Sequence, residues 1–248
     1  MRTVSVKSAA RVLDVLELMA GRTQGLRVNE MARQLAMPKS SASSLLATLA
    51  SRGYISPGSD GYRLAEIYRT AGWAGGMTAA LMRAAGPVMS RLVAATGESV
   101  FLGVATPDMR IQYIAKSVSS NELRYDVDLA SPRPAYCTSI GQVILSGLDT
   151  AALDRYFKTH ELKRITPRTV VDQRAIRRAV RKARDEGFVT IADSHVMGAS
   201  GVAAPVRAGA RVVAGLAAIA PNARFEANRD RIVPAVVAAA LLLGQALG

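Results

Sequence analysis

Cysteine and histidine are scarce in this chain, which has one cysteine, Cys137, and two histidines, His160 and His195, in 248 residues. One cysteine cannot form a disulfide within the chain, as is typical of proteins in a reducing cytoplasm. The three residues are also too few and too widely spaced for a zinc site, and neither a Walker-type phosphate loop nor a Gly-x-Ser-x-Gly nucleophile motif is present. We therefore expect no metal, no cofactor and no enzymatic activity. A hydrolase that pairs Cys137 with a histidine is the enzymatic alternative.

Long apolar runs are absent as well. The most hydrophobic segment, residues 232–247, is Ala-rich and contains Pro234 and Gln245, and it is shorter than the roughly 20 residues that cross a bilayer. The N-terminal residues are amphipathic and lack the charged start and apolar run of a signal peptide. The sequence predicts a buried C-terminal helix, no membrane partner and a cytoplasmic location.

Acidic residues are in the minority, because 19 Asp and Glu face 32 Lys and Arg, a formal net charge of +13. Such a balance favours an anionic partner, either nucleic acid or an acidic membrane surface. Basic residues exceed acidic ones both before and after residue 76, so charge alone does not locate the binding site.

The stretch of residues 28–64 has the pattern of a winged helix-turn-helix. A short helix after Asn29, a suitable N-cap, is followed by a turn at residues 36–38 and a second helix that ends at Gly53. Two β-forming segments then flank a turn at residues 57–61, which predicts a hairpin. Apolar residues recur at helical spacing on one face of the second helix: Ala42, Leu45, Leu46 and Leu49.

The opposite face of this second helix is small, hydroxylated and basic, which lets it enter a major groove and approach phosphates and base edges. An ordinary solvated surface is the alternative. The residues predicted to contact the DNA backbone are Lys39, Ser40 and Ser41 at the start of the helix, with Lys7, Arg52 and Arg63 around it. The residues predicted to face base edges are Ser43, Ser44 and Thr48.

The remaining pattern predicts an α+β protein of three parts. Residues 1–64 form the winged helix-turn-helix, residues 65–76 a linker helix and residues 77–248 a second domain with an antiparallel or mixed sheet. The strands of that second domain are predicted at residues 100–104, 111–114, 123–129, 189–192, 202–206 and 212–219. Its helices are predicted at residues 77–96, 139–147, 151–158, 172–186 and 232–247.

Four stretches together resemble the IclR family of bacterial transcriptional regulators. They are VKSAARVLDVLELMA (6–20), MPKSSASSLLATLASRGYI with GYRLA (37–55 and 61–65), RPAYCTSIGQVIL (133–145) and GFVTIADSHVMGASGVAAPV (187–206). The resemblance implies an N-terminal winged helix-turn-helix, a linker helix and a GAF-like effector-binding domain, assembled as a homodimer or homotetramer. It implies a ligand-responsive DNA-binding regulator.

Three departures from the family pattern bear on its sites. Most members carry a bulky polar pair, often His-Arg, where this chain has Ser43-Ser44, so an obvious bidentate guanine reader is missing. The effector loop reads Asp193-Ser194-His195 in place of two acidic residues, and Gln142 stands where a Lys is usual.

The effector pocket is expected between the second-domain sheet and the turns at residues 139–141 and 198–204, where small residues let backbone amides approach a ligand. A tight turn between strands is the alternative. The expected pocket residues are Ser139, Ile140, Gly141, Gly198 and Gly201, with Ala203 and Ala217 added by matching to family pocket positions. The nearby groups that can neutralise or hydrogen-bond a carboxylate are Arg133, Tyr136 and His195.

These observations predict a regulator of transcription, expected to be a repressor, that binds a pseudo-palindromic double-stranded operator as a homodimer or homotetramer. A small organic acid, with aromatic acids among the candidates, is expected to modulate operator binding from the second domain. The alternative in a different class is a DNA-binding protein of architectural role that has no ligand.

Overall fold

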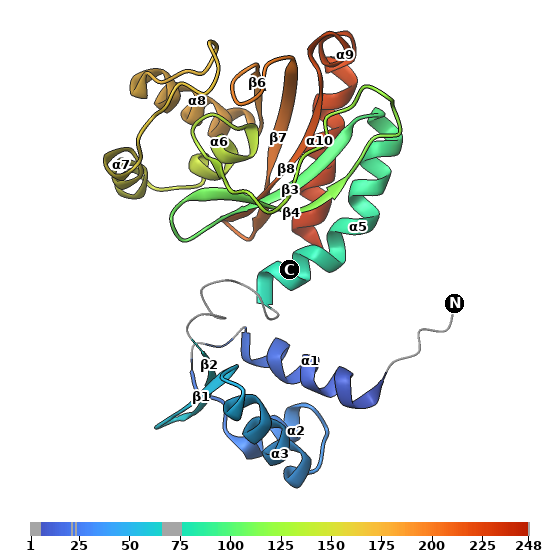
Figure 1. The fold of residues 1–248 in the computed structure, drawn as a ribbon, viewed down its shortest axis with the longest axis vertical. Helices are drawn as coiled ribbons and strands as arrows, with labels where there is room; N and C mark the ends of the chain where they lie inside the picture. The colour runs from blue at the N-terminus through green and yellow to red at the C-terminus, as the bar shows by residue number, and fades with distance from the viewer. Residues whose placement is uncertain (1–5, 21, 23, 66–75, 248) are drawn as a thin grey trace. The chain divides into compact units, whose positions relative to one another are not determined.

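The computed structural model describes residues 6–20, 22, 24–65 and 76–247 (Figure 1). The chain divides into two compact units, Met1–Leu81 and Met82–Gly248, and the division falls inside helix α5 (Gly76–Thr96). Of the linker helix predicted at residues 65–76, residues 66–75 lie outside the described residues. No helix within the described ranges is long and apolar enough to cross a membrane.

The N-terminal unit contains the predicted winged helix-turn-helix. Its elements are α1 (Lys7–Ala20), α2 (Val28–Gln34), α3 (Lys39–Ser51), β1 (Ile55–Gly58) and β2 (Gly61–Leu64). The two strands pair antiparallel as a hairpin. The apolar stripes of the three helices meet the hairpin in one small core, which contains Val15, Leu16, Met19, Leu26, Met31, Met37, Ala42, Leu46, Leu49, Ile55 and Leu64.

The N-cap predicted at Asn29 is wrong. Helix α2 begins at Val28, and Arg27 occupies the N-cap position without a side-chain cap. The reason is a backbone pairing one residue earlier, where Leu26 N donates to Tyr62 O at 2.8 Å and Tyr62 N to Leu26 O at 3.0 Å. This bridge holds the chain extended beside the hairpin, and the helix starts as soon as the bridge ends.

The C-terminal unit is built on a six-stranded antiparallel sheet of order β5-β4-β3-β8-β7-β6. Its strands are β3 (Ser99–Ala105), β4 (Arg110–Ser117), β5 (Arg133–Pro134), β6 (Val189–Ala192), β7 (Ala199–Ala208) and β8 (Arg211–Pro221). Ala214 to Ala220 of the central strand β8 are all buried, as expected for a sheet covered on both faces. The predicted α+β class is confirmed.

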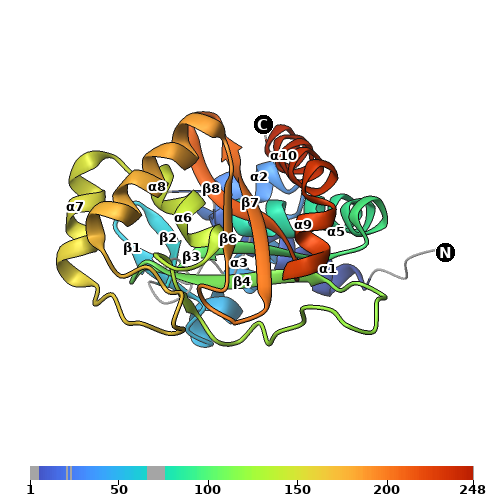
Figure 2. The ribbon, with the colours of Figure 1, turned by 90° about the horizontal axis from the view of Figure 1, so that it is seen from above.

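Helices cover both faces of this sheet (Figure 2). One group contains α5, α9 (Asn222–Ala227) and α10 (Arg229–Gln245), and the other contains α6 (Ser139–Ser146), α7 (Thr150–Thr159) and α8 (Gln173–Glu186). The predicted buried C-terminal helix is present as α10, which buries Ile232, Val236 and Leu243. Strand β5 and helix α9 were not predicted.

The strand predicted at residues 123–129 is wrong. Residues 118–132, called the strap below, have no regular secondary structure. Side chains of β4 take the carbonyl groups that a neighbouring strand would need, because Lys116 Nζ donates to Val127 O at 2.9 Å and Gln112 Nε2 donates to Leu129 O. The alternation that suggested a strand is nevertheless real, since Tyr125, Val127 and Leu129 pack on the core.

Candidate DNA-binding helix and ligand cavity

Helix α3 presents two different faces. Ala42, Leu46 and Leu49 are buried, and Leu45 is half-buried. On the other side the predicted DNA-facing residues are exposed, apart from Ser41, which is partly buried: Lys39, Ser40, Ser43, Ser44 and Thr48. Pro38 at the N-cap position offers no side-chain cap, so the first N–H groups of α3 are available to an anion.

One predicted base-facing hydroxyl is used within the helix. Thr48 Oγ1 donates to Ser44 O at 2.9 Å, a common arrangement for threonine in helices. Thr48 is therefore best placed to accept a hydrogen bond or to offer its methyl group to a partner.

The wing holds one of the predicted basic residues in an ion pair. Arg63 Nη2 lies 2.6 Å from Asp60 Oδ2, and Gly25 N donates to the same carboxylate oxygen at 2.9 Å. Arg63 and the Gly25 N–H lower the pKa of Asp60 to about 2. Gly61 completes the turn with φ +131°, where a Cβ would lie 2.7 Å from the Leu26 carbonyl carbon. Lys7 at the start of α1 and Arg52 at the end of α3 are exposed.

A concave surface of about 350 Å³ lies between the starts of α2 and α3 and the wing, and Arg27, Asn29, Lys39 and Tyr62 contribute to it. Arg27 is exposed and brings a second cation to the same hollow as Lys39. Arg27 was not predicted as a DNA contact, although a basic residue directly before a helix could have indicated it. Two cations and uncapped helix starts fit a DNA phosphate.

The C-terminal unit contains a small cavity of about 40 Å³ beside the strap. Of the predicted effector residues, Ser139, His195 and Gly201 line it. Ala199, in the turn predicted at residues 198–204, also lines it. Its other residues were not predicted, because they come from separate strands, the strap, the segment before α6 and the β6–β7 turn: Tyr113, Tyr125, Cys137, Thr138, Ile191, Ser194, Val196 and Ile219.

A larger groove of about 1100 Å³ lies beside the cavity, and three predicted residues, Arg133, Tyr136 and His195, line it. His195 borders both hollows. Its Nδ1 is buried and has no hydrogen-bond partner within the described part of the chain. Burial and, to a smaller degree, the charge of Arg133 lower the pKa of His195 below its ordinary value, so the ring is neutral at pH 7.

Arg133 is a buried cation that contacts backbone carbonyl groups and an aromatic ring. The residue is only 7% exposed, and its guanidinium donates to Asp128 O at 3.0 Å and to Ser131 O at 3.1 Å. Its guanidinium carbon lies 4.4 Å from the centre of the Tyr113 ring. None of the ion pairs among the described residues includes Arg133.

Side chains at and before the start of α6 are bonded within the protein beside these hollows. Thr138 Oγ1 accepts from Gly141 N at 3.2 Å, and Gln142 Nε2 donates to Tyr136 O at 2.8 Å. Gly141 is obligatory, because a Cβ there would lie 2.1 Å from Ala135 O. Four predicted effector residues are packed in this interior and border neither hollow: Ile140, Gly141, Ala203 and Ala217.

The predicted effector residue Gly198 borders neither hollow and follows the alternative of a tight turn, and the Cys137 thiol is buried. Gly198 lies in an exposed turn with φ +81°, and its N–H donates to Asp193 Oδ1 at 2.6 Å, so this amide is used within the turn. Burial raises the pKa of the Cys137 thiol to about 12. The thiol is therefore protonated and is a poor nucleophile.

A winged helix-turn-helix followed by an α+β unit defines a DNA-binding transcriptional regulator, not an enzyme. The sequence of residues 77–244 matches the family model of the bacterial transcriptional regulator IclR C-terminal domain. Residues 8–59 match the family model of the IclR helix-turn-helix domain. The chain belongs to the IclR family.

Individual relatives agree with this assignment. The chain is 29% identical over 229 residues to the HTH-type transcriptional regulator KdgR of Escherichia coli, covering 91% of this chain and 86% of the relative. It is 26% identical over 200 residues to the Pca regulon regulatory protein of Pseudomonas putida, covering 80% and 68%. The fold resembles the crystal structure of an IclR homologue from Microbacterium hydrocarbonoxydans complexed with 4-hydroxybenzoate, with a TM-score of 0.63, 23% identity and coverage of 96% and 98%.

Proposed function

We propose that this chain represses transcription by binding a pseudo-palindromic operator, and that a small organic acid bound in the C-terminal unit changes its operator affinity. The observation that carries the ligand response is His195, whose buried Nδ1 lacks a partner within the described residues. A buried polar atom without a hydrogen bond costs free energy that a ligand recovers when it supplies the bond.

The chemistry around His195 favours an acid with an apolar body. Arg133 is a buried guanidinium that contacts carbonyl groups and a tyrosine ring, and a charge-assisted hydrogen bond to a carboxylate is stronger than one to a neutral group. Beside it the cavity offers tyrosine rings and the aliphatic side chains of Ile191 and Ile219, which suit an aromatic ring. The ligand named for the homologue from Microbacterium, 4-hydroxybenzoate, has both parts and is the first compound to test.

On the DNA side, we place one α3 helix of each protomer in successive major grooves of the operator. Lys39, with Arg27 beside it, neutralises phosphate, and the exposed serines of α3 approach base edges. Because serine is short, much of the specificity then comes from close fit and DNA shape rather than from bidentate base contacts.

A thermal-shift and calorimetric screen tests the ligand. We expect 4-hydroxybenzoate to stabilise the full-length protein, by about 2.7 kcal/mol at a concentration of 100 Kd. The matched neutral compound 4-hydroxybenzamide should bind at least tenfold more weakly, and pyruvate reports on acids without a ring. Arg133→Gln should lower the affinity for the acid and leave the affinity for the amide unchanged. Arg174→Gln, which alters an exposed arginine of α8, is the control.

Operator binding is then measured by footprinting and fluorescence anisotropy on DNA that flanks the protein's own gene, with and without the ligand. A change in operator affinity on ligand addition supports the proposal. If a panel of acids neither stabilises the protein nor changes operator binding, the response to a ligand is refuted and the architectural alternative remains.

A further inference from the structure

The strap, residues 118–132, is one of two parts of the cavity wall without a strand ladder, the other being the turn between β6 and β7. The cavity of about 40 Å³ is far smaller than the roughly 300 Å³ or more of ordinary ligand sites, so an aromatic acid must displace part of the lining. Tyr125 of the strap lines the cavity and packs edge-on to Phe101, with ring centres 5.5 Å apart. Since the strap has no strand ladder, it opens more readily than the sheet or α6.

The beginning of the strap is attached to the corner between α5 and β3. Ser119 Oγ donates to Gly97 O at 2.5 Å, and Asn121 Nδ2 donates to the same oxygen at 3.0 Å. Ser119 N also donates to Ser99 Oγ at 3.1 Å. Gly97 directly follows α5, and its own N–H closes the helix on Val93 O at 2.7 Å.

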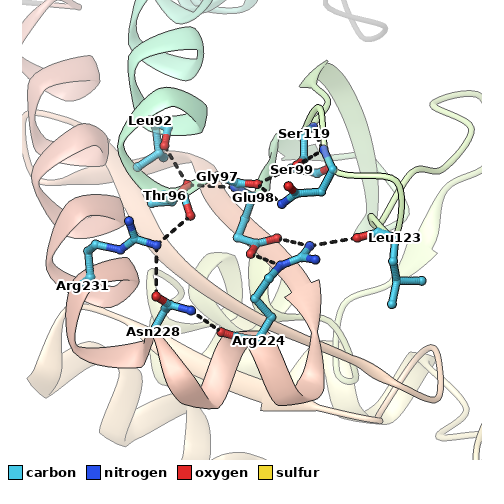
Figure 3. Close-up of polar contacts among 11 residues, drawn as sticks. Leu92, Thr96, Gly97, Glu98, Ser99, Ser119, Leu123, Arg224, Asn228 and Arg231 are labelled. Atoms are coloured by element: carbon cyan, nitrogen blue, oxygen red, sulfur yellow. Dashed lines mark hydrogen bonds and ion pairs between the residues drawn. The ribbon is translucent and has the colours of Figure 1, made fainter.

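Arg224 of α9 connects the strap to this corner by a second route (Figure 3). Its Nε and Nη2 both bind the Glu98 carboxylate, the Nη2–Oε2 distance being 2.7 Å, and Nη2 also donates to Leu123 O at 2.9 Å. Glu98 is 2% exposed. One guanidinium therefore joins a strap carbonyl to a buried carboxylate two residues past the end of α5.

The base of Arg224 is itself fixed. Asn228 Nδ2 donates to Arg224 O at 2.9 Å, and Arg231 Nη2 donates to Asn228 Oδ1 at 3.1 Å and to Thr96 O at 3.2 Å (Figure 3). If the strap moves away, the bond from Arg224 Nη2 to Leu123 O breaks, because pulling Arg224 off Glu98 would leave a buried carboxylate unpaired, which is strongly unfavourable. The loss of that bond removes one of the contacts that hold the guanidinium on Glu98 beside the end of α5.

We infer that Arg224 is a positioning residue that couples the strap beside the ligand cavity to the last turn of α5. This inference rests on the proposed function, because it takes the cavity as the ligand site. In the sequence, residues 66–75 join the DNA-binding unit to the start of α5. A ligand that displaces the strap therefore acts on the helix that follows this segment. By linkage, if ligand binding shifts the equilibrium between two states of the α5 end by a given factor, the ligand affinities of those two states differ by the same factor.

Hydrogen exchange read by mass spectrometry on the full-length protein tests the coupling without a ligand. Lys116→Met releases the far end of the strap, because Lys116 Nζ lies 2.6 Å from Asp126 Oδ1 and holds Val127 O. We expect this variant to speed exchange severalfold both in the strap and in residues 92–97. Arg224→Lys keeps a cation beside Glu98 and the fold, but it cannot bridge to Leu123. In that background Lys116→Met should still speed exchange in the strap, but its effect on residues 92–97 should fall severalfold, leaving the bonds of Ser119 and Asn121 to Gly97 O as the link.

Arg231→Lys is the matched control, since Arg231 holds Thr96 O but has no bond to the strap, and Lys116→Met should keep its effect on residues 92–97 there. The inference is overturned if Lys116→Met loosens the strap and leaves residues 92–97 unchanged. It is equally overturned if the effect at residues 92–97 is undiminished with Arg224→Lys.

A second arm adds 4-hydroxybenzoate and measures operator affinity. An unchanged operator response in Arg224→Lys, at equal ligand affinity, overturns the inference while the proposed function stands. A ligand that binds the wild-type protein without any operator response refutes the proposed function, and the exchange cycle still decides whether Arg224 couples the strap to α5.

Discussion

Helices α3 and α6 both combine hydroxyl and aliphatic residues, but they lie in opposite environments. Helix α3 exposes most of its hydroxyls and lacks a side-chain cap. Helix α6 is buried along all of its residues and is capped by Thr138. In α6 the side chains of Gln142 and Ser146 are bonded within the protein, so they serve as scaffold. In α3 the polar face is turned to solvent, so it is free to meet a partner.

The residues around the ligand cavity likewise divide into those whose polar groups have internal hydrogen bonds and those whose polar groups have none. Thr138 and Gln142 have internal hydrogen bonds, whereas His195 Nδ1 has none within the described part of the protein. An unbonded polar atom in an otherwise bonded interior is the stronger indication of a binding site. Four substitutions test how far this comparison holds.

The largest effect is expected for Gly141→Ala in α6. The new Cβ would lie 2.1 Å from Ala135 O and 2.4 Å from Ala135 Cα, and backbone cannot give way as a side chain can. We expect the free energy of unfolding to fall by at least about 3 kcal/mol, measured by chemical denaturation. Gly86→Ala in α5, where nothing lies within 4 Å of the new Cβ, is the control and should stabilise the protein by about 0.5–1 kcal/mol. Equal midpoints for the two variants would show that α6 is not a tightly packed scaffold.

Lys39→Ala tests the exposed helix. It should weaken binding to operator and to random DNA alike, severalfold at low salt, and reduce the slope of log affinity against log salt by about one unit for each contacting lysine. Lys158→Ala, an exposed lysine of α7, is the control. An unchanged salt slope would remove Lys39 from the DNA interface.

Asp60→Asn tests the wing with a smaller effect. Removing the carboxylate frees the Arg63 guanidinium from its ion pair at 2.6 Å and deletes a negative charge where phosphate is expected. We expect operator affinity to rise a few-fold at low salt and the salt slope to steepen by about one unit. Weaker binding with unchanged stability would mean that the Asp60–Arg63 pair shapes the wing for DNA and that Arg63 does not itself contact phosphate.

The local parts of this fold were predictable from sequence. Helices α1 to α3 and the long helix α5 follow from apolar residues at helical spacing, and β3 and β4 follow from β-forming runs around a turn. The irregular structure of the strap was not predictable. The alternation of Tyr125, Val127 and Leu129 shows which side chains face the core, but it does not show whether a neighbouring backbone is free to pair with this segment. Lys116 and Gln112 occupy those carbonyl groups.

The candidate sites were predictable in proportion to how local they are. The residues of α3 share one helix, so their common exposure follows from periodicity. The cavity is assembled from β4, the strap, α6 and the β6–β7 turn, and Tyr113 and Tyr125 meet His195 only through long-range packing. The Arg224–Glu98 pair joins residues 126 positions apart, and no sequence spacing indicates such a contact.

The smallest effect is expected for His195→Gln, read as stability against pH. Burial and the charge of Arg133 hold the pKa of His195 in the folded protein below the ordinary 6.5. As pH falls below about 6.5 the unfolded chain takes up a proton that the folded protein resists, so the histidine lowers stability in that window and contributes nothing above it.

Glutamine does not titrate, so the wild-type protein should lose more stability than His195→Gln between pH 7.5 and about 5.5, with a difference in Tm of no more than about 2 °C. Thermal unfolding at matched ionic strength measures it. A bound carboxylate would offset the positive charge of Arg133 and favour the imidazolium, so saturating ligand should shrink the difference between the two proteins. If the two pH profiles are parallel with and without ligand, His195 is an ordinary interior residue, and the contrast between bonded scaffold and unbonded site fails in the C-terminal unit.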